Sequence, residues 1–224
     1  MYPDLFVITS VINTGTKPWS YTAQRSCFTR EERFQQTLQT IDSIRSYHGT
    51  CNIMLVECSE LTEGETTILQ SKVDHFMQTY DDLSVRHACL QSEKKGYGEV
   101  KKLEKACTYI KEQGLLFHRL FKISGRYFLN ENFQQDNYSS TLFTFKMYGP
   151  ESGSTVLYSV PFEQCNDYYN QLRNCIHIYE TNPPTGLEIL IPVLCAPRRE
   201  IIQLGVSGHV AVLNDQGVPD FYTA

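Results

Sequence analysis

Short apolar runs alternate with longer amphipathic stretches through the first two thirds of the chain. The runs are rich in β-branched, aromatic and other apolar residues, which favours strands. Four strands are predicted, at 4–12, 52–58, 84–90 and 120–123. The last of them is apolar enough to be buried on both faces, as in a sheet covered by helices.

Between these runs, apolar residues recur every three or four positions, as on one face of a helix. Thr29 and Thr62 each stand three residues before a glutamate, a capping-box spacing that marks two helix starts. The predicted stripes occupy 30–45, 62–80 and 95–110. Strands and helices that alternate in this way predict a mostly parallel sheet with right-handed crossovers.

The pattern changes in the last third. Two apolar runs at 140–147 and 154–160 flank a Gly-Pro turn and predict antiparallel strands. A helical stripe at 162–178, a short apolar helix at 187–194 and a strand-like run at 201–213 follow. We therefore expect one α/β domain over residues 1–224, with a βαβ half at 1–136 and a half of different pattern at 137–224.

Composition narrows the function classes. A net charge of -5 argues against a nucleic-acid-binding protein, which would normally carry a basic face. No apolar stretch is long enough for a membrane span, and the N-terminus lacks a signal pattern. None of the eight cysteines forms a Cys-x-x-Cys pair, so we expect reduced thiols rather than a zinc site. These features predict a cytoplasmic location.

Polar residues gather where the predicted parallel strands end. Thr9 and Ser10 end the first strand and Glu57 the second, while the segment Lys94–Glu99 carries two lysines and two glycines before a helix. Ligands of open α/β sheets bind beyond the carboxyl ends of the strands. Hydroxyls and a carboxylate suit a ribose or base there, and cations suit phosphates.

The fourth predicted strand ends in Lys122, Ser124, Gly125, Arg126 and Tyr127. Alternation places Lys122, Ser124 and Arg126 on one side, and Gly125 allows close approach of a ligand. Two cations and a hydroxyl beside a glycine suit a diphosphate. The alternative is a core strand whose cations only reach out to solvent.

Three arginines surround the first predicted helix start, at positions 25, 30 and 33. A helix N-terminus with arginines beside it can bind an anion, and Arg30 is our candidate there. Ordinary paired surface charges explain the cluster equally well. No G-x-G-x-x-G, P-loop, H-E-x-x-H or G-x-S-x-G motif is present, which argues against the enzyme classes that those motifs mark.

A family resemblance adds to this interpretation. Four segments resemble a group of bacterial and viral GT-A-like nucleotide-diphospho-sugar glycosyltransferases: R-x-x-R-F-x-Q-T-x-x-T-I-x-S-I-R at 30–45, L-V-E-C-S-E-L at 55–61, K-G-x-G-E at 95–99 and F-K-I-S-G-R-Y-F-L at 121–129. The resemblance implies a GT-A-like, Rossmann-like sheet flanked by helices, with a small antiparallel addition in the C-terminal third. It also implies that 1–136 is the nucleotide-binding half and 137–224 the acceptor-side half. Its motifs are less diagnostic than a P-loop.

One departure from the family pattern concerns metal binding. GT-A enzymes usually carry Asp-x-Asp after the central strand to hold a divalent ion on the diphosphate, and this chain has Ser124-Gly125-Arg126 there. We assign no metal ligands, although Mn²⁺ or Mg²⁺ dependence stays open. Lys122 and Arg126 are expected to replace the metal, and Asp81-Asp82 is expected to form a turn.

The expected activity is transfer of a sugar from a nucleoside diphosphate, with a UDP-type donor favoured, to a glycan or other hydroxyl acceptor. Glu188, a lone carboxylate in an apolar helix, and His209 are the candidates for the proton-accepting group. For Glu188 the alternative is a carboxylate on the surface of its helix. For His209 the alternative is a strand histidine whose hydrogen bonds are satisfied within the protein. The rival function is a non-catalytic GT-A-like module that binds a glycan or a partner, and nucleotidyl transfer is a weaker third.

Overall fold

The computed structural model describes residues 2–20, 22–182, 185–214 and 217–224. In the N-terminal part the elements are β1 (Asp4–Ser10), α1 (Arg30–His48), β2 (Cys51–Glu57), α2 (Glu63–Lys72), β3 (His75–Gln78), α3 (Leu83–Leu90), α4 (Lys95–Glu112), β4 (Arg119–Ser124) and β5 (Tyr127–Leu129). They are followed by β6 (Phe143–Lys146), β7 (Leu157–Pro161), α5 (Cys165–Thr181), α6 (Leu187–Leu194), β8 (Arg198–Ile201), β9 (Val206–Leu213) and β10 (Pro219–Thr223). Short 3₁₀ turns lie at Gln135–Tyr138 and Phe162–Gln164.

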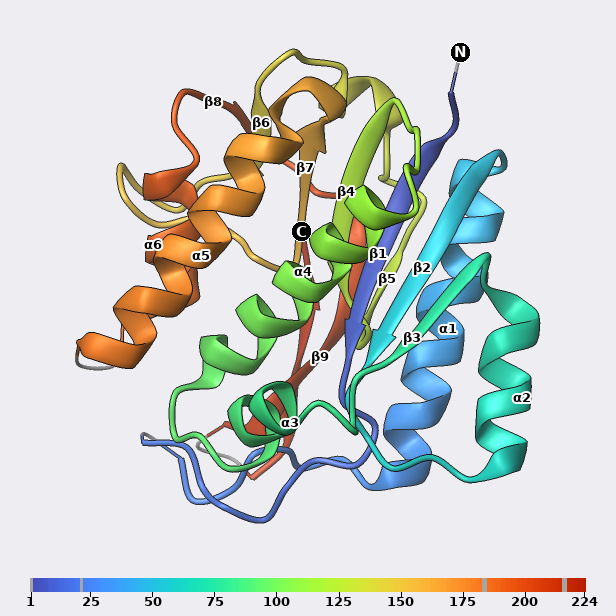
Figure 1. Cartoon of the computed structure of the whole chain (residues 1–224), viewed down its shortest axis with the longest axis vertical. Helices are drawn as coiled ribbons and strands as arrows, with labels where there is room; N and C mark the ends of the chain where they lie inside the picture. Colours follow the sequence, from blue (N-terminus) through green and yellow to red (C-terminus); the bar gives the residue numbers. More distant parts are fainter. Residues whose placement is uncertain (1, 21, 183–184, 215–216) are drawn as a thin grey trace.

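A seven-stranded sheet in the order β3-β2-β1-β4-β7-β6-β8 forms the centre of the molecule (Figure 1). Strands β1 to β4 are parallel, and β7 joins β4 in the antiparallel direction. Thr9 lies beside Ser124 in the register, and Ser10 lies beside Glu57. The predicted mostly parallel sheet is confirmed, and the polar ends of β1, β2 and β4 share one edge.

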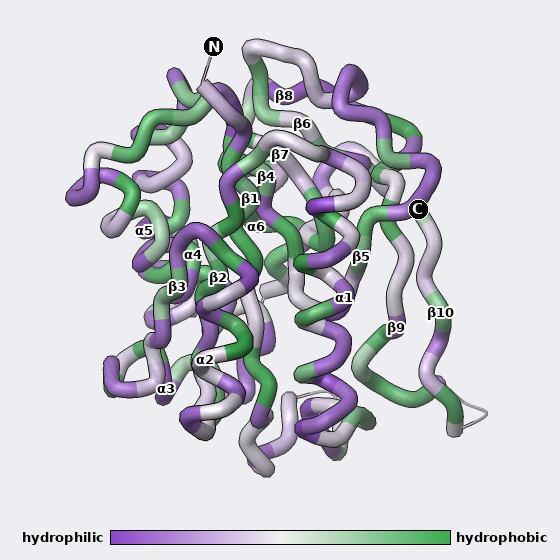
Figure 2. Tube along the Cα trace, turned by 90° about the vertical axis from the view of Figure 1, so that its right-hand side faces the viewer, coloured by the Kyte–Doolittle hydropathy of each residue, from purple (hydrophilic) through white to green (hydrophobic). Residues whose placement is uncertain are grey.

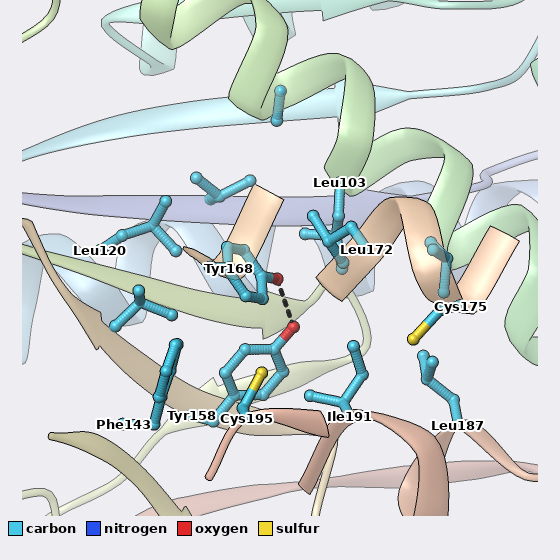
Figure 3. Close-up of a cluster of buried hydrophobic side chains, with 14 of the residues drawn as sticks. Leu103, Leu120, Phe143, Tyr158, Tyr168, Leu172, Cys175, Leu187, Ile191 and Cys195 are labelled. Atoms are coloured by element: carbon cyan, nitrogen blue, oxygen red, sulfur yellow. Dashed lines mark hydrogen bonds between the residues drawn. The ribbon is translucent and has the colours of Figure 1, made fainter. Parts of the chain in front are cut away.

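The two faces of this sheet are covered by different elements because side chains alternate along each strand. Leu5 and Val7 of β1 pack in a cluster with α4, α5 and α6, whereas Phe6 and Ile8 pack on the other side with α1 and the second sheet. Hydrophobic residues concentrate along the central strands (Figure 2). In the first cluster, Tyr158 and Tyr168 are fully buried and satisfy each other through a 2.5 Å hydroxyl hydrogen bond (Figure 3).

A second, three-stranded antiparallel sheet has the order β10-β9-β5. Tyr127 of β5 lies opposite Gly208 of β9, and the Thr40 hydroxyl of α1 donates to the Tyr127 carbonyl at 2.8 Å. This sheet is the antiparallel addition predicted for the C-terminal third. Among the described residues, no helix is long and apolar enough to cross a membrane.

The prediction of a strand at 84–90 is wrong, because this segment is the helix α3. Asp82 caps it by accepting hydrogen bonds from the backbone N–H groups of Ser84 and Val85. Val85, Ala88 and Cys89 are buried at helical spacing. The cap was the decisive signal, and it also gives the expected turn at Asp81-Asp82 a specific function.

The third parallel strand is instead β3, which lies inside the stretch predicted as one long helix. Helix α2 ends at Lys72, and the Asp74 carboxylate accepts the Ile53 N–H at 2.7 Å. This bond sets the chain beside β2, with Met54 opposite His75. Pairing with β2 thus decides the structure of this segment, although its apolar residues recur at the spacing of a helix.

Helix α4 begins at Lys95, so most of the predicted 94–99 loop is its first turn. Its glycines allow close packing: a Cβ on Gly98 would lie 2.7 Å from Cys89 Cα. The predicted strand at 201–213 is likewise divided, because β8 ends at Ile201 and β9 begins at Val206. Gly205 turns the chain between them with φ +73°.

Candidate functional site

A pocket opens at the carboxyl ends of β1 and β4. The sequence predicts polar residues at these strand ends. Figure 1 shows the segment between β1 and α1 crossing this end of the molecule, at the bottom of the view. That segment, α3, the start of α4 and β9 form the walls. The lining residues are Thr9, Val11, Thr14, Trp19, Arg25, Arg33, Cys89, Lys95, Gly98, Glu99, Lys102, Ser124, Arg126 and Ala211.

The charge of this lining is strongly positive. It holds five cations, Arg25, Arg33, Lys95, Lys102 and Arg126, against one carboxylate. That carboxylate, Glu99, forms an ion pair with the buried Lys122 behind the pocket. Burial alone would raise the pKa of Glu99, but the ammonium groups of Lys122 and Lys102 hold it below its ordinary value. The surplus positive charge favours an anionic ligand.

Arg25 fixes the long segment between β1 and α1. Its guanidinium donates to the carbonyls of Lys17, Cys89 and Ser92, and it lies 3.9 Å from the centre of the Trp19 ring. These contacts tie the segment to α3. The wall of the pocket is therefore held in place without any ligand.

Two further cations are buried and bonded to backbone. Arg33 Nε donates to the Val11 carbonyl at 2.6 Å, and Lys102 Nζ donates to the Ser10 carbonyl at 2.8 Å. Burial, with the neighbouring Arg126 charge, lowers the pKa of Arg33 to about 9. Arg33 stays protonated near neutral pH. The direct hydrogen-bond partners of both side chains are neutral carbonyls rather than carboxylates.

Arg126 differs from these cations because its guanidinium donates to no residue that the structure describes. It is half-buried and lies 5.3 Å from the centre of the Tyr127 ring. The side chain lines the pocket, so its N–H groups are available to a ligand. Planar guanidinium groups bind phosphate oxygens with two parallel hydrogen bonds.

Lys122 occupies a different environment from Arg126, although the strand pattern predicted a shared direction. It is completely buried and contacts Glu99, the Thr155 carbonyl and, at 2.8 Å, the Ser124 hydroxyl. Burial lowers its pKa, and the attraction of Glu99 opposes the shift. Its three N–H groups are thus committed within the protein.

The other predicted donor-site residues are distributed around this pocket. Thr9 and Ser124 line it, and Gly125 packs close to Ser10, whose hydroxyl bonds to Thr37 at 3.0 Å. Glu57 is fully buried and accepts the Ile12 N–H at 2.9 Å.

Arg30 and Tyr127 also lie outside the pocket lining. Arg30 pairs with Glu65 on the outer side of α1, at 2.5 Å. Tyr127 is buried, and its carbonyl bonds to α1.

A second compartment adjoins the first and shares Lys95 and Glu99 with it. Glu188 lines this compartment from the first turn of α6. Lys94 lines it as well, but its ammonium group is bonded to the carbonyls of Tyr179 and Asn182. Two carboxylates, Glu99 and Glu188, therefore face one space next to the cationic pocket.

His209 lies on β9 at the rim of the site. Its ring contacts those of Phe28 and Phe221, with centroid distances of 5.9 and 4.9 Å. The pair of Tyr127 and Gly208 ends the ladder between β5 and β9, with Arg126 just before Tyr127 and His209 just after Gly208. His209 and Arg126 therefore lie at the same end of this ladder.

The residues at the expected metal position do not fit a divalent cation. Neither a glycine side chain nor a guanidinium supplies an oxygen ligand, which leaves only the Ser124 hydroxyl. Among the described residues, no group of three or more His, Cys, Asp or Glu side chains could hold a metal ion. The pair Asp81-Asp82 does not supply a metal ligand at this position, because Asp82 caps α3.

Sequence reasoning did not select Trp19, Arg33 or Lys102 as site residues. A signal for Lys102 existed: it stands four residues after Gly98 and four before Ala106, both on the packed face of α4. A lysine on such a face must be buried with a partner. No local signal marks Trp19, because its position depends on the fold of a long irregular segment.

Solved structures with the same fold complete the description. The galactosyltransferase LgtC, crystallised with donor and acceptor sugar analogues, matches 88% of this chain and 72% of its own length, with a TM-score of 0.54 and 7% identity. A protein from Desulfovibrio desulfuricans named as a nucleotide-diphospho-sugar transferase matches 90% of this chain and 80% of its own, with a TM-score of 0.50 and 8% identity.

The glycosyltransferase GlyE of Streptococcus pneumoniae has a TM-score of 0.50 and 9% identity over 90% of this chain and 45% of its own. No protein-family model matches the sequence, and a comparison with curated proteins gives no significant match. The likeness is therefore one of architecture. This chain has the GT-A-like fold of nucleotide-diphospho-sugar transferases.

Proposed function

We propose that the protein is a glycosyltransferase that moves a sugar from a nucleoside diphosphate, with a uridine nucleotide favoured, to a hydroxyl group of a glycan. The observation that carries the proposal is the Arg126 guanidinium, which has no acceptor among the described residues and lines a cationic pocket at the carboxyl ends of the strands of a GT-A-like sheet. Arg33 and Lys102 add fixed charge behind it.

The reaction needs positive charge where the bond breaks. As the sugar leaves, negative charge grows on the diphosphate, and the sugar carbon becomes oxocarbenium-like. Donors that are already in place stabilise such charge without reorganisation. Arg126 serves as the direct phosphate ligand in this scheme, while Lys122 neutralises Glu99 and so keeps the pocket positive.

The acceptor hydroxyl must lose a proton, and two groups are placed to take it. Glu188 faces the second compartment, and His209 stands at the end of the β5–β9 ladder that Arg126 precedes. The compartment shares Lys95 and Glu99 with the phosphate pocket, so a sugar held there adjoins the diphosphate. We assign Glu188 as the base and His209 as a residue on the acceptor side.

The experiment is a panel of UDP-, GDP-, dTDP- and CMP-sugars in which nucleotide release is measured with and without saccharide acceptors. Release from one donor class, accelerated by an acceptor and lost in Glu188→Gln, is the expected result. A well-folded protein that binds saccharides but cleaves no donor would support the rival non-catalytic module. Parallel reactions with Mn²⁺ and with a chelator test metal dependence directly.

A further inference from the structure

Two cysteine thiols meet behind one wall of the cationic pocket. Cys58 directly follows β2, and Cys89 lies in the last turn of α3. Together with Val85 they form a small buried cluster, separate from the two main cores. The two thiols are hydrogen-bonded to each other, and both are free in the structure. The fold therefore brings together a dithiol from two segments that are far apart in the sequence.

The two thiols differ in their access to the pocket. Cys89 lines the pocket and keeps 6% of its surface exposed, whereas Cys58 is completely buried. A small reagent that enters the pocket therefore meets the sulfur of Cys89 first. Cys58 lies behind it, in contact with that same sulfur.

The surroundings of Cys58 favour its thiolate form. The hydrogen bond with Cys89 lowers the pKa of the Cys58 thiol, burial opposes this shift, and the nearby Lys102 ammonium group adds to the lowering. Lys102 Nζ donates to the Ser10 carbonyl at 2.8 Å, and the Cys58 N–H donates to the same carbonyl at 3.3 Å. A thiolate is the form of cysteine that attacks an oxidised sulfur. By contrast, burial raises the pKa of four other thiols, those of Cys107, Cys165, Cys175 and Cys195.

We propose that Cys58 and Cys89 form a reversible disulfide when the protein meets a peroxide, and that this bond reshapes the pocket. The peroxide first oxidises Cys89: an S–O bond forms, the O–O bond breaks and one water leaves. The Cys58 thiolate then attacks the Cys89 sulfur, the S–S bond forms, and the displaced hydroxide leaves as a second water with the proton of the Cys58 thiol. Two thiols are thereby oxidised and one peroxide is reduced.

The new bond displaces α3 rather than the sheet. A disulfide holds its sulfurs about 2.0 Å apart, much closer than two hydrogen-bonded thiols. The Cys58 backbone is bonded to the end of β1, so the end of α3 makes the larger shift. This shift reaches α4, because a Cβ on Gly98 would lie only 2.7 Å from Cys89 Cα. The first turn of α4 carries Lys95, which lines the pocket.

The same shift reaches the long segment between β1 and α1. The Cys89 carbonyl accepts a hydrogen bond from the Arg25 guanidinium at 2.8 Å, and this guanidinium lies 3.9 Å from the centre of the Trp19 ring. Arg25 and Trp19 both line the pocket. Trp19 is the single tryptophan of the chain, so its fluorescence reports on this wall alone.

The experiment compares the whole chain before and after treatment with hydrogen peroxide. Mass spectrometry of unreduced peptides should find Cys58 joined to Cys89, and dithiothreitol should separate them. Trp19 emission should change as the bond forms and return after reduction. Calorimetry should show roughly tenfold weaker binding of uridine diphosphate to the oxidised protein, because the displaced wall carries cations that suit phosphates. This last effect rests on the proposed function.

Two variants, Cys58→Ser and Cys58→Ala, remove the buried partner without changing the pocket lining. Both should bind uridine diphosphate as the reduced wild type does, and their Trp19 emission should not respond to peroxide. The matched control is Cys27→Ser, which removes a half-buried thiol in the segment before α1 and should keep the wild-type response. Melting curves establish that each variant is folded.

The proposal is overturned if peroxide leaves Cys58 and Cys89 unlinked in the folded wild type. It is equally overturned if the emission change persists in both Cys58 variants, or if the linked protein keeps the emission and nucleotide affinity of the reduced form.

Failure of this switch is distinguishable from failure of the proposed function. If the disulfide forms and shifts Trp19 emission but no nucleotide sugar is cleaved by the reduced protein, the switch stands and the transferase activity fails. If the reduced protein cleaves donors and peroxide links no cysteines, the transferase stands and the switch fails.

Discussion

The two ends of the central sheet both bury charge, and they do so in opposite ways. At the amino end, the buried Asp4 carboxylate lies 2.9 Å from a ring nitrogen of His48 and 3.2 Å from one of His118. It also accepts a hydrogen bond from the Gln135 amide at 2.8 Å. The buried Asp4 carboxylate thus has its imidazole and amide partners within the chain.

At the carboxyl end, the cations outnumber the carboxylates. Arg25, Arg33 and Lys102 are buried and bonded to neutral carbonyls, and Arg126 has no protein acceptor among the described residues. Buried charges normally have ionic partners. The difference teaches that the amino end pairs its charge within the chain, whereas the carboxyl end keeps a surplus of positive charge that suits the proposed anionic ligand.

The largest effect that this contrast predicts is on stability. Asp4→Ala should remove about 3 to 5 kcal/mol from the free energy of unfolding, because it leaves a buried imidazolium without its partner. Urea denaturation measures the loss. Asp42→Ala, which breaks the exposed pair with Lys72, is the control and should cost less than about 1 kcal/mol. Equal losses in both variants would show that the buried contacts of Asp4 stabilise the fold no more than an exposed ion pair does.

The next effect should appear in donor binding and leave stability unchanged. Arg126→Ala should weaken donor handling by about 1.5 to 3 kcal/mol, roughly ten- to a hundredfold, since a charge-assisted phosphate contact is lost. Arg126→Lys should restore part of it, because a point charge cannot bind two oxygens in parallel.

The matched control for Arg126 is Arg86→Ala, which removes another arginine that lies over a tyrosine ring, at 4.9 Å, but does not line the pocket. Calorimetry with uridine diphosphate and melting temperatures give the readouts. Unchanged donor binding in a folded Arg126→Ala protein would contradict the assignment of Arg126 as a phosphate ligand. A large drop in melting temperature would make Arg126 part of the fold instead.

The amino-end network also predicts a pH dependence of stability. Burial alone would lower the pKa of His48, but hydrogen bonding to Asp4 raises it to about 9. The folded state thus holds the His48 proton more tightly than the unfolded chain does. The stabilisation is complete below pH 6.5 and is lost as pH rises through 9, by an amount of the order of 1 to 3 kcal/mol.

Urea unfolding at pH 6, 7.5 and 9 with a thiol reductant measures this decline, and His48→Gln should flatten it. A wild-type stability that rises over this interval would rule out the assigned charge state. Donor binding by the carboxyl end should not follow the same profile.

The smallest effect concerns Arg30. Its two contacts with Glu65 hold the pKa of that carboxylate at about 2, yet the pair is partly exposed and should contribute less than about 1 kcal/mol. Arg30→Ala should leave donor affinity unchanged in calorimetry. A tenfold loss would mean that the anion site extends to the first turn of α1 after all.

Local patterns in the sequence predict most of the fold. Both capping boxes mark helix starts correctly, because each satisfies backbone N–H groups within one turn. Segment 84–90 was misassigned since a short apolar run fits strand and helix alike, and only the Asp82 cap distinguishes them. Strand β3 escaped prediction because pairing with β2, not local preference, creates it.

The site was less accessible to sequence reasoning. The strand end at Arg126 was found because alternation and a glycine are local features. The neutralisation of Lys122 on β4 could not be foreseen, because its partner Glu99 comes from helix α4. The same holds for Arg33 and Lys102, whose bonds to Val11 and Ser10 exist only when α1 and α4 pack beside β1.

The carbonyl-bound cations have a consequence for how this pocket is inherited. A salt bridge ties two side chains together, so that a change at one position must be matched at the other. Arg25, Arg33 and Lys102 bind main-chain oxygens, which almost any amino acid supplies. Val11, Cys89 and Ser92 can therefore drift in sequence while the charge they hold stays in place. We therefore expect the three basic residues to be retained in related sequences, without side chains that change together with them.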